Sequence, residues 1–170
     1  MFINTLPIIF TYTSLFSIFE ACIFFTAIFF LVYVYTPDVN KKWTVKPSNS
    51  FYNFLHSAWD GNTSLWSAFW PFFLLVNIIL FYIDYRVMNL TYTITSWKTA
   101  HGMMFLPIIW WTISVWRCSR NSGYRIYSSA ARTITIYLFL EFFLRFIISY
   151  LYPSTFFDCR LLILAHGDCL

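Results

Sequence analysis

The sequence predicts an all-α, polytopic integral membrane protein with about four transmembrane helices and a short interfacial amphipathic helix. Two observations predict this class. Of the 170 residues, 59% are hydrophobic and 11% are charged, whereas soluble domains carry about 25% charged residues. The apolar residues also form runs long enough for a helix to cross a hydrocarbon core of roughly 30 Å. Because so few polar side chains could not cover a water-facing surface, we expect residues 1–170 to form a single membrane domain.

The first span is predicted over residues 8–35, which carry a single charge, Glu20. Pro7 precedes this run and suits the first position of a helix, whereas Pro37 follows it and stops a helix. The run exceeds the roughly 20 residues that a crossing requires. It therefore predicts a helix that tilts or protrudes from the bilayer.

A polar connection over residues 38–64 contains a segment with helical periodicity. Its apolar side chains recur at the spacing of one helix face: Phe51, Phe54, Leu55, Ala58 and Trp59. We predict a short amphipathic helix over about residues 51–60 that lies in the membrane interface, with Asn53, His56 and Asp60 facing water. A helix packed on another part of the same complex would show the same pattern, and both interpretations stay open.

The second and third spans are predicted over about residues 65–83 and 99–116. The second has Trp66 near one end and Tyr82 near the other, as in the aromatic belts of membrane interfaces. Residues 84–98 are mixed in character, and we interpret them as a loop or a helical extension.

The fourth span, over about residues 134–152, differs because it carries Glu141 and Arg145. These residues are one helical turn apart, in the favoured order for an ion pair. A charge in lipid is costly unless it is satisfied, so this face should point into a protein interior. The remaining residues 153–170 are predicted to form an extracytoplasmic tail.

The distribution of basic residues predicts the orientation. Seven basic residues lie in the connections after the first and third spans: Lys41, Lys42, Lys46, Arg117, Arg120, Arg125 and Arg132. Three lie on the other side of the membrane: Arg86, Lys98 and Arg160. The positive-inside rule then places both connections in the cytoplasm and both termini outside. Because the basic residues are scattered along span boundaries and form no single face, they do not indicate a nucleic-acid partner.

The cysteines agree with this orientation. Cys159 and Cys169 fall on the outer side, where disulfides persist, and we predict a possible disulfide between them. Cys22 and Cys118 fall where thiols stay reduced. Four unrelated free cysteines are the alternative, and the absence of a CxxC motif gives no support to a zinc or redox-relay site.

The polar residues do not form a recognisable catalytic, phosphate-binding or metal-binding motif. His56, His101 and His166 fall at different predicted depths, which argues against a haem, and His101 is interpreted as a helix-start feature. We therefore expect no enzyme activity and no cofactor. Glu20, Glu141 and Arg145 are the charges deep within spans, and they indicate either helix–helix contact or a proton path. Because the sequence offers a single ion pair and no chain of further titratable groups, helix–helix contact is favoured over a proton path.

Two segments carry a resemblance: LWSAFW at residues 65–70 and VWRCSRN at 115–121. Together they resemble small, poorly characterised bacterial inner-membrane proteins with an LWxxFW opening and a VWRCxxN turn. The resemblance covers residues 64–135 and implies a bacterial inner membrane without enzymatic residues. The first span and the tail are not covered. A fainter similarity to cytochrome oxidase subunit III concerns Glu20 and His101, but the paired histidines and further helices of that subunit are missing.

These observations favour a non-catalytic structural subunit of a multi-protein inner-membrane complex, such as a bacterial secretion or envelope machine. Its partners would be membrane lipid and other membrane-protein subunits, in a bacterial plasma membrane in preference to a mitochondrial one. The expected structural or docking residues are Glu20, Arg117, Arg120, Glu141 and Arg145. A small respiratory-chain subunit and a self-contained ion channel or transporter are the alternatives.

Overall fold

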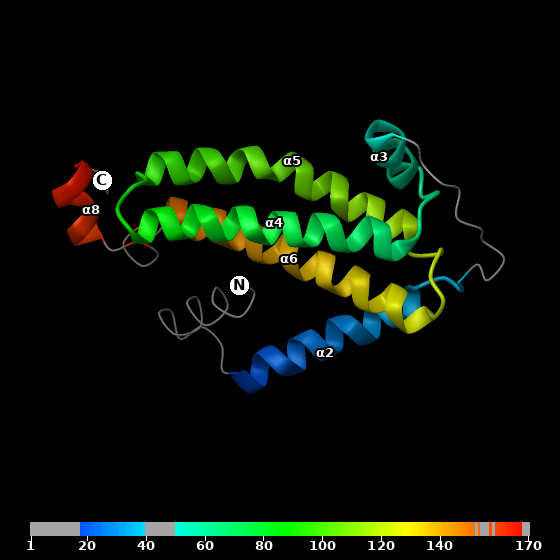
Figure 1. Cartoon of the computed structure of the whole chain (residues 1–170). Coiled ribbons are helices and arrows are strands. Elements are labelled where there is room, and N and C mark those ends of the chain that lie inside the picture. The colour runs from blue at the N-terminus through cyan, green and yellow to red at the C-terminus, as the bar shows by residue number, and fades with distance from the viewer. Residues whose placement is uncertain (1–17, 40–49, 152, 154–156, 158, 168–170) are drawn as a thin grey trace. The chain divides into compact units, whose positions relative to one another are not determined.

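The computed structural model describes residues 18–39, 50–151, 153, 157 and 159–167, and every regular element in these ranges is a helix (Figure 1). The helices are α2 (Ile18–Tyr35), α3 (Phe51–Trp59), α4 (Leu65–Met88), α5 (Ile94–Cys118), α6 (Arg125–Leu151) and α8 (Cys159–His166). The predicted all-α class is therefore confirmed.

Two of the described helices are long and apolar enough to cross a membrane, over Leu65–Val87 and Arg125–Leu151. Helix α2 contributes a shorter apolar segment, Cys22–Tyr35, and the first part of its predicted span, residues 8–17, lies outside the described residues. Helix α5 is 25 residues long, but the lysine, histidine and tryptophans within it lower its hydropathy. The number of four spans thus stays a prediction.

The helices extend beyond the apolar runs from which the spans were predicted. Helix α4 continues past Ile83 to Met88, and α5 already begins at Ile94, where the Thr93 hydroxyl accepts a hydrogen bond from the backbone N–H of Ser96 at 3.0 Å. Such a cap satisfies a donor that the first turn leaves unpaired. Of the two interpretations of residues 84–98, a helical extension is therefore confirmed for residues 84–88 and 94–98, and residues 89–93 form the connection.

The described residues divide into two compact units. The first includes Leu75–Leu106 and Leu140–Leu170, and the second comprises Ile18–Leu74 and Pro107–Phe139. The predicted single domain over residues 1–170 includes residues outside the described set and stays a prediction.

The first unit has a hydrophobic core that includes α8, an element that the sequence did not predict. Trp97 of α5 is 1% exposed and packs edge-on against Phe157, with 5.4 Å between ring centroids. Leu162 of α8 belongs to the same core, and His166 Nε2 lies 2.7 Å from the backbone oxygen of Leu90. The predicted tail is therefore partly a helix that packs on the α4–α5 connection.

In the second unit, α3 packs against its own chain. Ala58 is fully buried in a cluster with Ala68 and Cys118, while Asn53, His56 and Asp60 are exposed, as the periodicity predicted. Phe51, which shares the apolar face by periodicity, is the first residue of α3 and is 72% exposed. The helix predicted at about residues 51–60 is thus confirmed as α3. Its buried face packs against α4 and α5 within the second unit.

Gly61, which follows α3, can be tested by substitution. Its φ of +77° is in the left-handed region, and an added Cβ would lie 3.0 Å from Cβ of Arg117 and 3.2 Å from its carbonyl oxygen. We expect Gly61→Ala to lower the free energy of unfolding by more than about 1 kcal/mol, because both the backbone and the packing oppose it. Thermal unfolding in detergent, followed by circular dichroism, measures the loss.

Gly123→Ala is the matched control, because nothing lies within 4 Å of an added Cβ there. Equal stability of the two variants would contradict the close approach of Gly61 to Arg117.

Candidate functional site

A buried charge cluster lies in the first unit. The Arg145 side chain, on α6, is 3% exposed and contacts two carboxylates. Its Nη1 donates a hydrogen bond to Asp84 Oδ2 at 2.8 Å, and its Nε lies 3.2 Å from Glu141 Oε1. The structure therefore joins Glu141 and Arg145 directly and adds a third charged residue.

Asp84 is the member of this cluster that sequence reasoning missed. The predicted second span ends at about residue 83, just before Asp84, but Asp84 lies within α4 and accepts a hydrogen bond from Trp97 Nε1 at 3.1 Å. A signal was present: Asp84 follows Leu80 by four residues and precedes Val87 by three, and both neighbours are buried. It thus continues the buried face of α4.

His101 lies beside the cluster and is fully buried. Its ring stacks on Trp97 with 3.6 Å between centroids and on Phe142 with 5.5 Å. Nδ1 lies 3.1 Å from the Trp97 carbonyl oxygen, whereas Nε2 has no hydrogen-bond partner among the described residues. The expectation that His101 marks a helix start is wrong, because α5 begins at Ile94, about two turns earlier.

One guanidinium contacts two carboxylates: Arg145 lies 2.8 Å from Asp84 Oδ2 and 3.2 Å from Glu141 Oε1. An uncompensated buried charge is costly, so the cluster requires its three members together. Because Asp84 is on α4, Arg145 is on α6 and Trp97 is on α5, the same contacts join the three helices within the first unit. Chemically, the cluster can hold helices or accept a proton.

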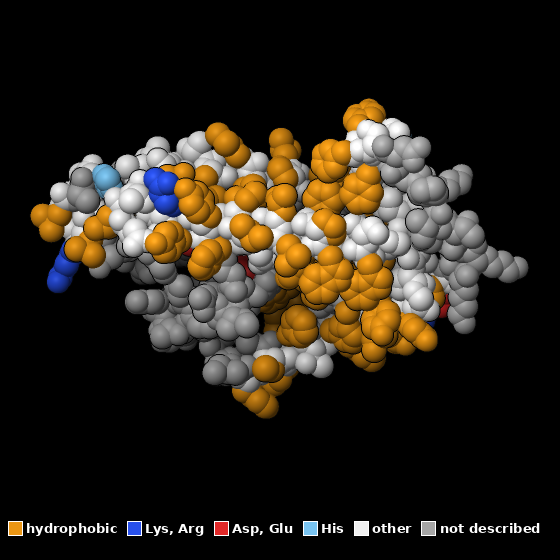
Figure 2. Space-filling view, in the orientation of Figure 1, with side chains coloured by type: hydrophobic (Ala, Val, Ile, Leu, Met, Phe, Trp, Pro, Cys, Tyr) orange, Lys and Arg blue, Asp and Glu red, His pale blue; other side chains and the backbone are white. Residues whose placement is uncertain are grey.

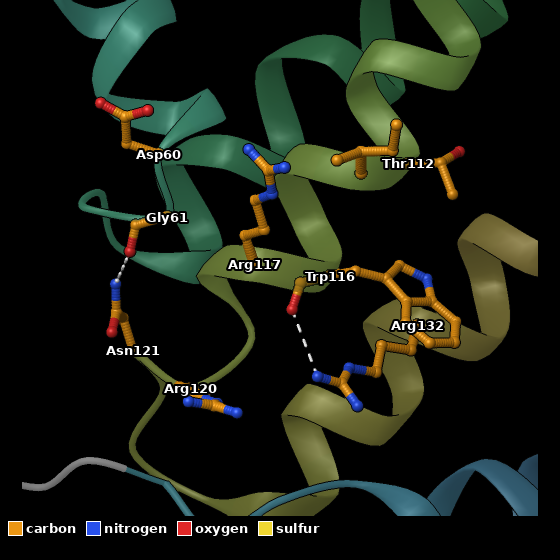
Figure 3. A pocket seen from close by; sticks show the side chains of 9 residues that line it. Asp60, Gly61, Thr112, Trp116, Arg117, Arg120, Asn121 and Arg132 are labelled. Atoms are coloured by element: carbon orange, nitrogen blue, oxygen red, sulfur yellow. Dashed lines mark hydrogen bonds between the residues drawn. The ribbon is translucent and has the colours of Figure 1, made fainter.

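A second feature is a pocket in the second unit, with a volume of about 630 Å³ (Figure 3). We call it the basic pocket. It is lined by Asp60, Gly61, Thr112, Ile113, Trp116, Arg117, Arg120, Asn121 and Arg132. Three of these residues are arginines, and two of them, Arg117 and Arg120, were predicted docking residues.

Residues of the VWRCSRN segment build one wall of the basic pocket. The Asn121 amide nitrogen donates hydrogen bonds to the carbonyl oxygens of Gly61 at 2.7 Å and Thr63 at 2.8 Å. Arg117 Nη1 donates to the Trp59 carbonyl oxygen at 2.8 Å, and its guanidinium lies over the Trp59 ring. These contacts hold the α3–α4 connection against the end of α5.

Cys118, in the same VWRCSRN segment, is fully buried and does not line the pocket. Its Sγ donates to the Ala58 carbonyl oxygen at 3.4 Å and lies 3.2 Å from Thr63 Oγ1. Burial raises the pKa of the Cys118 thiol, and hydrogen bonding with Thr63 opposes this shift to a smaller extent. A thiol that stays protonated is a poor nucleophile, so Cys118 has a structural role.

The five predicted docking residues thus fall into separate places. Glu141 and Arg145 meet in the first unit, and Arg117 and Arg120 line the basic pocket of the second unit. Glu20 is exposed on α2 and also belongs to the second unit. Of the predicted disulfide partners, Cys159 begins α8 and Cys169 lies outside the described residues, so that pairing stays a prediction.

No protein-family model matches this sequence, and no curated protein or solved structure is detectably similar to it. The resemblance of residues 64–135 to bacterial inner-membrane proteins therefore rests on the two quoted segments alone.

Replacing Arg145 tests the charge cluster. Arg145→Met leaves Asp84 and Glu141 without their cation, and breaking a buried ion pair costs about 3–5 kcal/mol. We expect a large fall in the apparent Tm of the purified protein in detergent. The apparent Tm of Arg145→Lys should fall less, because an ammonium keeps the positive charge. It should still fall, because an ammonium cannot contact both carboxylates as a guanidinium does.

Arg160→Met, at an exposed position of α8, is the control and should melt like the wild type. If Arg145→Met also melted like the wild type, the charge cluster would not stabilise the first unit.

Proposed function

We propose that this protein is a non-catalytic subunit of a multi-protein membrane complex. The supporting observation is the amount of apolar surface on its two longest apolar helices. Only 28% of the most apolar window of each is buried. Side chains exposed along them include Leu75, Ile78, Phe81, Phe143 and Leu144. Figure 2 shows hydrophobic side chains spread along the face that it draws. Such surface needs lipid or other helices around it.

The proposed arrangement has four spans, with α2 and α5 added to α4 and α6. The basic residues place the 38–64 and 117–132 connections in the cytoplasm and both termini outside. We assign the chain to a bacterial plasma membrane in preference to a mitochondrial inner membrane, within a secretion or envelope complex. The LWSAFW and VWRCSRN segments support this assignment.

The contacts of Arg145 refine which residues would meet a partner. Both charged partners of Arg145 come from its own unit, Asp84 and Glu141, so its role is to hold helices of that unit together. Arg117 likewise has a partner within its own unit, because it donates a hydrogen bond to the Trp59 carbonyl oxygen. The exposed aromatic and aliphatic side chains would then form the contacts with partner proteins, and aromatic side chains are enriched at protein interfaces.

A proton or ion path is the second candidate function, and the first unit provides a specific observation for it. The sequence offered one ion pair, whereas the structure adds Asp84. It also stacks the buried His101 ring on Trp97, which donates to Asp84, and within the described residues His101 Nε2 has no hydrogen-bond partner. Intramembrane carboxylates and histidines are the usual components of proton relays.

One substitution separates the two functions. Glu141→Gln removes a charge-assisted contact worth about 1.5–3 kcal/mol. If the chain is a structural subunit, the weaker packing within the first unit should cause a tagged Glu141→Gln variant to recover fewer partner proteins in mild detergent than the wild type. Mass spectrometry of the co-purified proteins measures this loss.

Asp38→Asn is the matched carboxylate-to-amide control, because Asp38 is 96% exposed, and it should leave recovery unchanged. Proton flux by the purified chain in liposomes, abolished in Glu141→Gln while partner recovery stays normal, would replace the subunit proposal by the transport function. Co-purification with haem or copper proteins would instead favour the respiratory-chain alternative.

A further inference from the structure

The basic pocket brings three guanidinium groups together. Arg117 and Arg120 come from the end of α5 and the turn after it, and Arg132 comes from α6. Asp60 is the single carboxylate in the lining, and its Oδ2 lies 2.9 Å from His56 Nδ1. The formal charge of the lining is therefore positive even when Asp60 is ionised.

The arginines of the pocket are held by neutral groups. The buried Arg132 donates from Nε to Ser119 Oγ at 2.9 Å and from Nη2 to the Trp116 carbonyl oxygen at 3.2 Å. Arg117 donates to a backbone carbonyl, as described above. Arg120 is exposed and makes no hydrogen bond or ion pair within the described part of the chain. None of the three has a carboxylate partner among the described residues.

Arg120 and Arg132 face each other across the pocket, with their guanidinium groups directed into the space between them (Figure 3). Their charges repel each other. An anion between the two groups would turn this repulsion into two attractive contacts. A guanidinium presents five N–H donors in a planar fork that matches the oxygens of a phosphate, so unused donors remain on both side chains.

We propose that the basic pocket binds a phosphate group, as a lipid headgroup or as a free phosphate, between Arg120 and Arg132. Its volume of about 630 Å³ exceeds that of a phosphate and leaves room for the remainder of a headgroup. The pocket includes the end of α5, where the predicted span meets water and where lipid phosphates lie. Arg132 is fixed by Ser119 and Trp116 and orients the anion, while Arg120 closes over it.

The test uses the full-length protein in neutral detergent, with thermal stability recorded against ligand concentration at constant ionic strength. The probes are inorganic phosphate and phosphatidylglycerol, with diacylglycerol, which lacks the phosphate, as the neutral comparison. Arg120→Ala should weaken the apparent affinity on the order of tenfold, since it removes charge-assisted contacts. Arg120 is exposed and makes no hydrogen bond or ion pair among the described residues, so this variant should fold.

Two further variants complete the design. Arg160→Ala removes another exposed arginine, outside the pocket, and should leave the affinity unchanged. Asp60→Asn removes the carboxylate from the lining and should tighten binding by a few fold. Stabilisation by both probes would support a free-phosphate site, and stabilisation by phosphatidylglycerol alone would support a lipid headgroup. Equal losses in Arg120→Ala and Arg160→Ala, or stabilisation by neither probe, would overturn the proposal.

Discussion

The buried guanidinium of Arg145 is the constraint on which the first unit depends. An arginine within an apolar helix must be compensated, because an uncompensated charge in a low-dielectric interior is far more costly than the net worth of any single pair. Glu141 compensates it from the same helix and Asp84 compensates it from α4. Trp97 of α5 then orients Asp84 through its indole N–H. One charge thus determines how these parts of three helices pack.

The second unit satisfies its arginines in a different way. There Arg117 and Arg132 donate to backbone carbonyls and a hydroxyl, which accept hydrogen bonds but carry no charge. The hydrogen bonds of Arg117 join α5 to the end of α3, and those of Arg132 join α6 to Trp116 and Ser119. They leave the positive charge uncompensated by carboxylates among the described residues. The first unit therefore contains a charge cluster that is satisfied internally, whereas the second presents a charge available to an anion.

Local patterns in the sequence predicted the features that depend on local structure. The apolar runs gave the helical class, the spacing of Phe54, Leu55 and Ala58 gave α3, and the one-turn spacing gave the Glu141–Arg145 pair. The helix α8 and the burial of His101 were not predicted, because both depend on tertiary packing against Trp97.

Asp84 shows the same limit most clearly. Its partner Arg145 is 61 residues away in the chain, and no single-sequence pattern reports a pairing over that separation. A hydropathy criterion also ends a span at the first charged residue, so it assigned Asp84 to the boundary when the structure places it on the buried face of α4. The basic pocket was not predicted for a similar reason: Arg120 and Arg132 line the same pocket only because α6 folds back beside α5.

A double-mutant cycle on Asp84 and Arg145 tests the central claim most directly. The cycle compares the unfolding free energies of Asp84→Asn, Arg145→Met and the double variant with that of the wild type. If their ion pair holds α4 and α6 together within the first unit, the coupling energy should be about 1–3 kcal/mol, with the double variant less destabilised than the sum of the single variants. Additivity within about 0.5 kcal/mol would contradict this account.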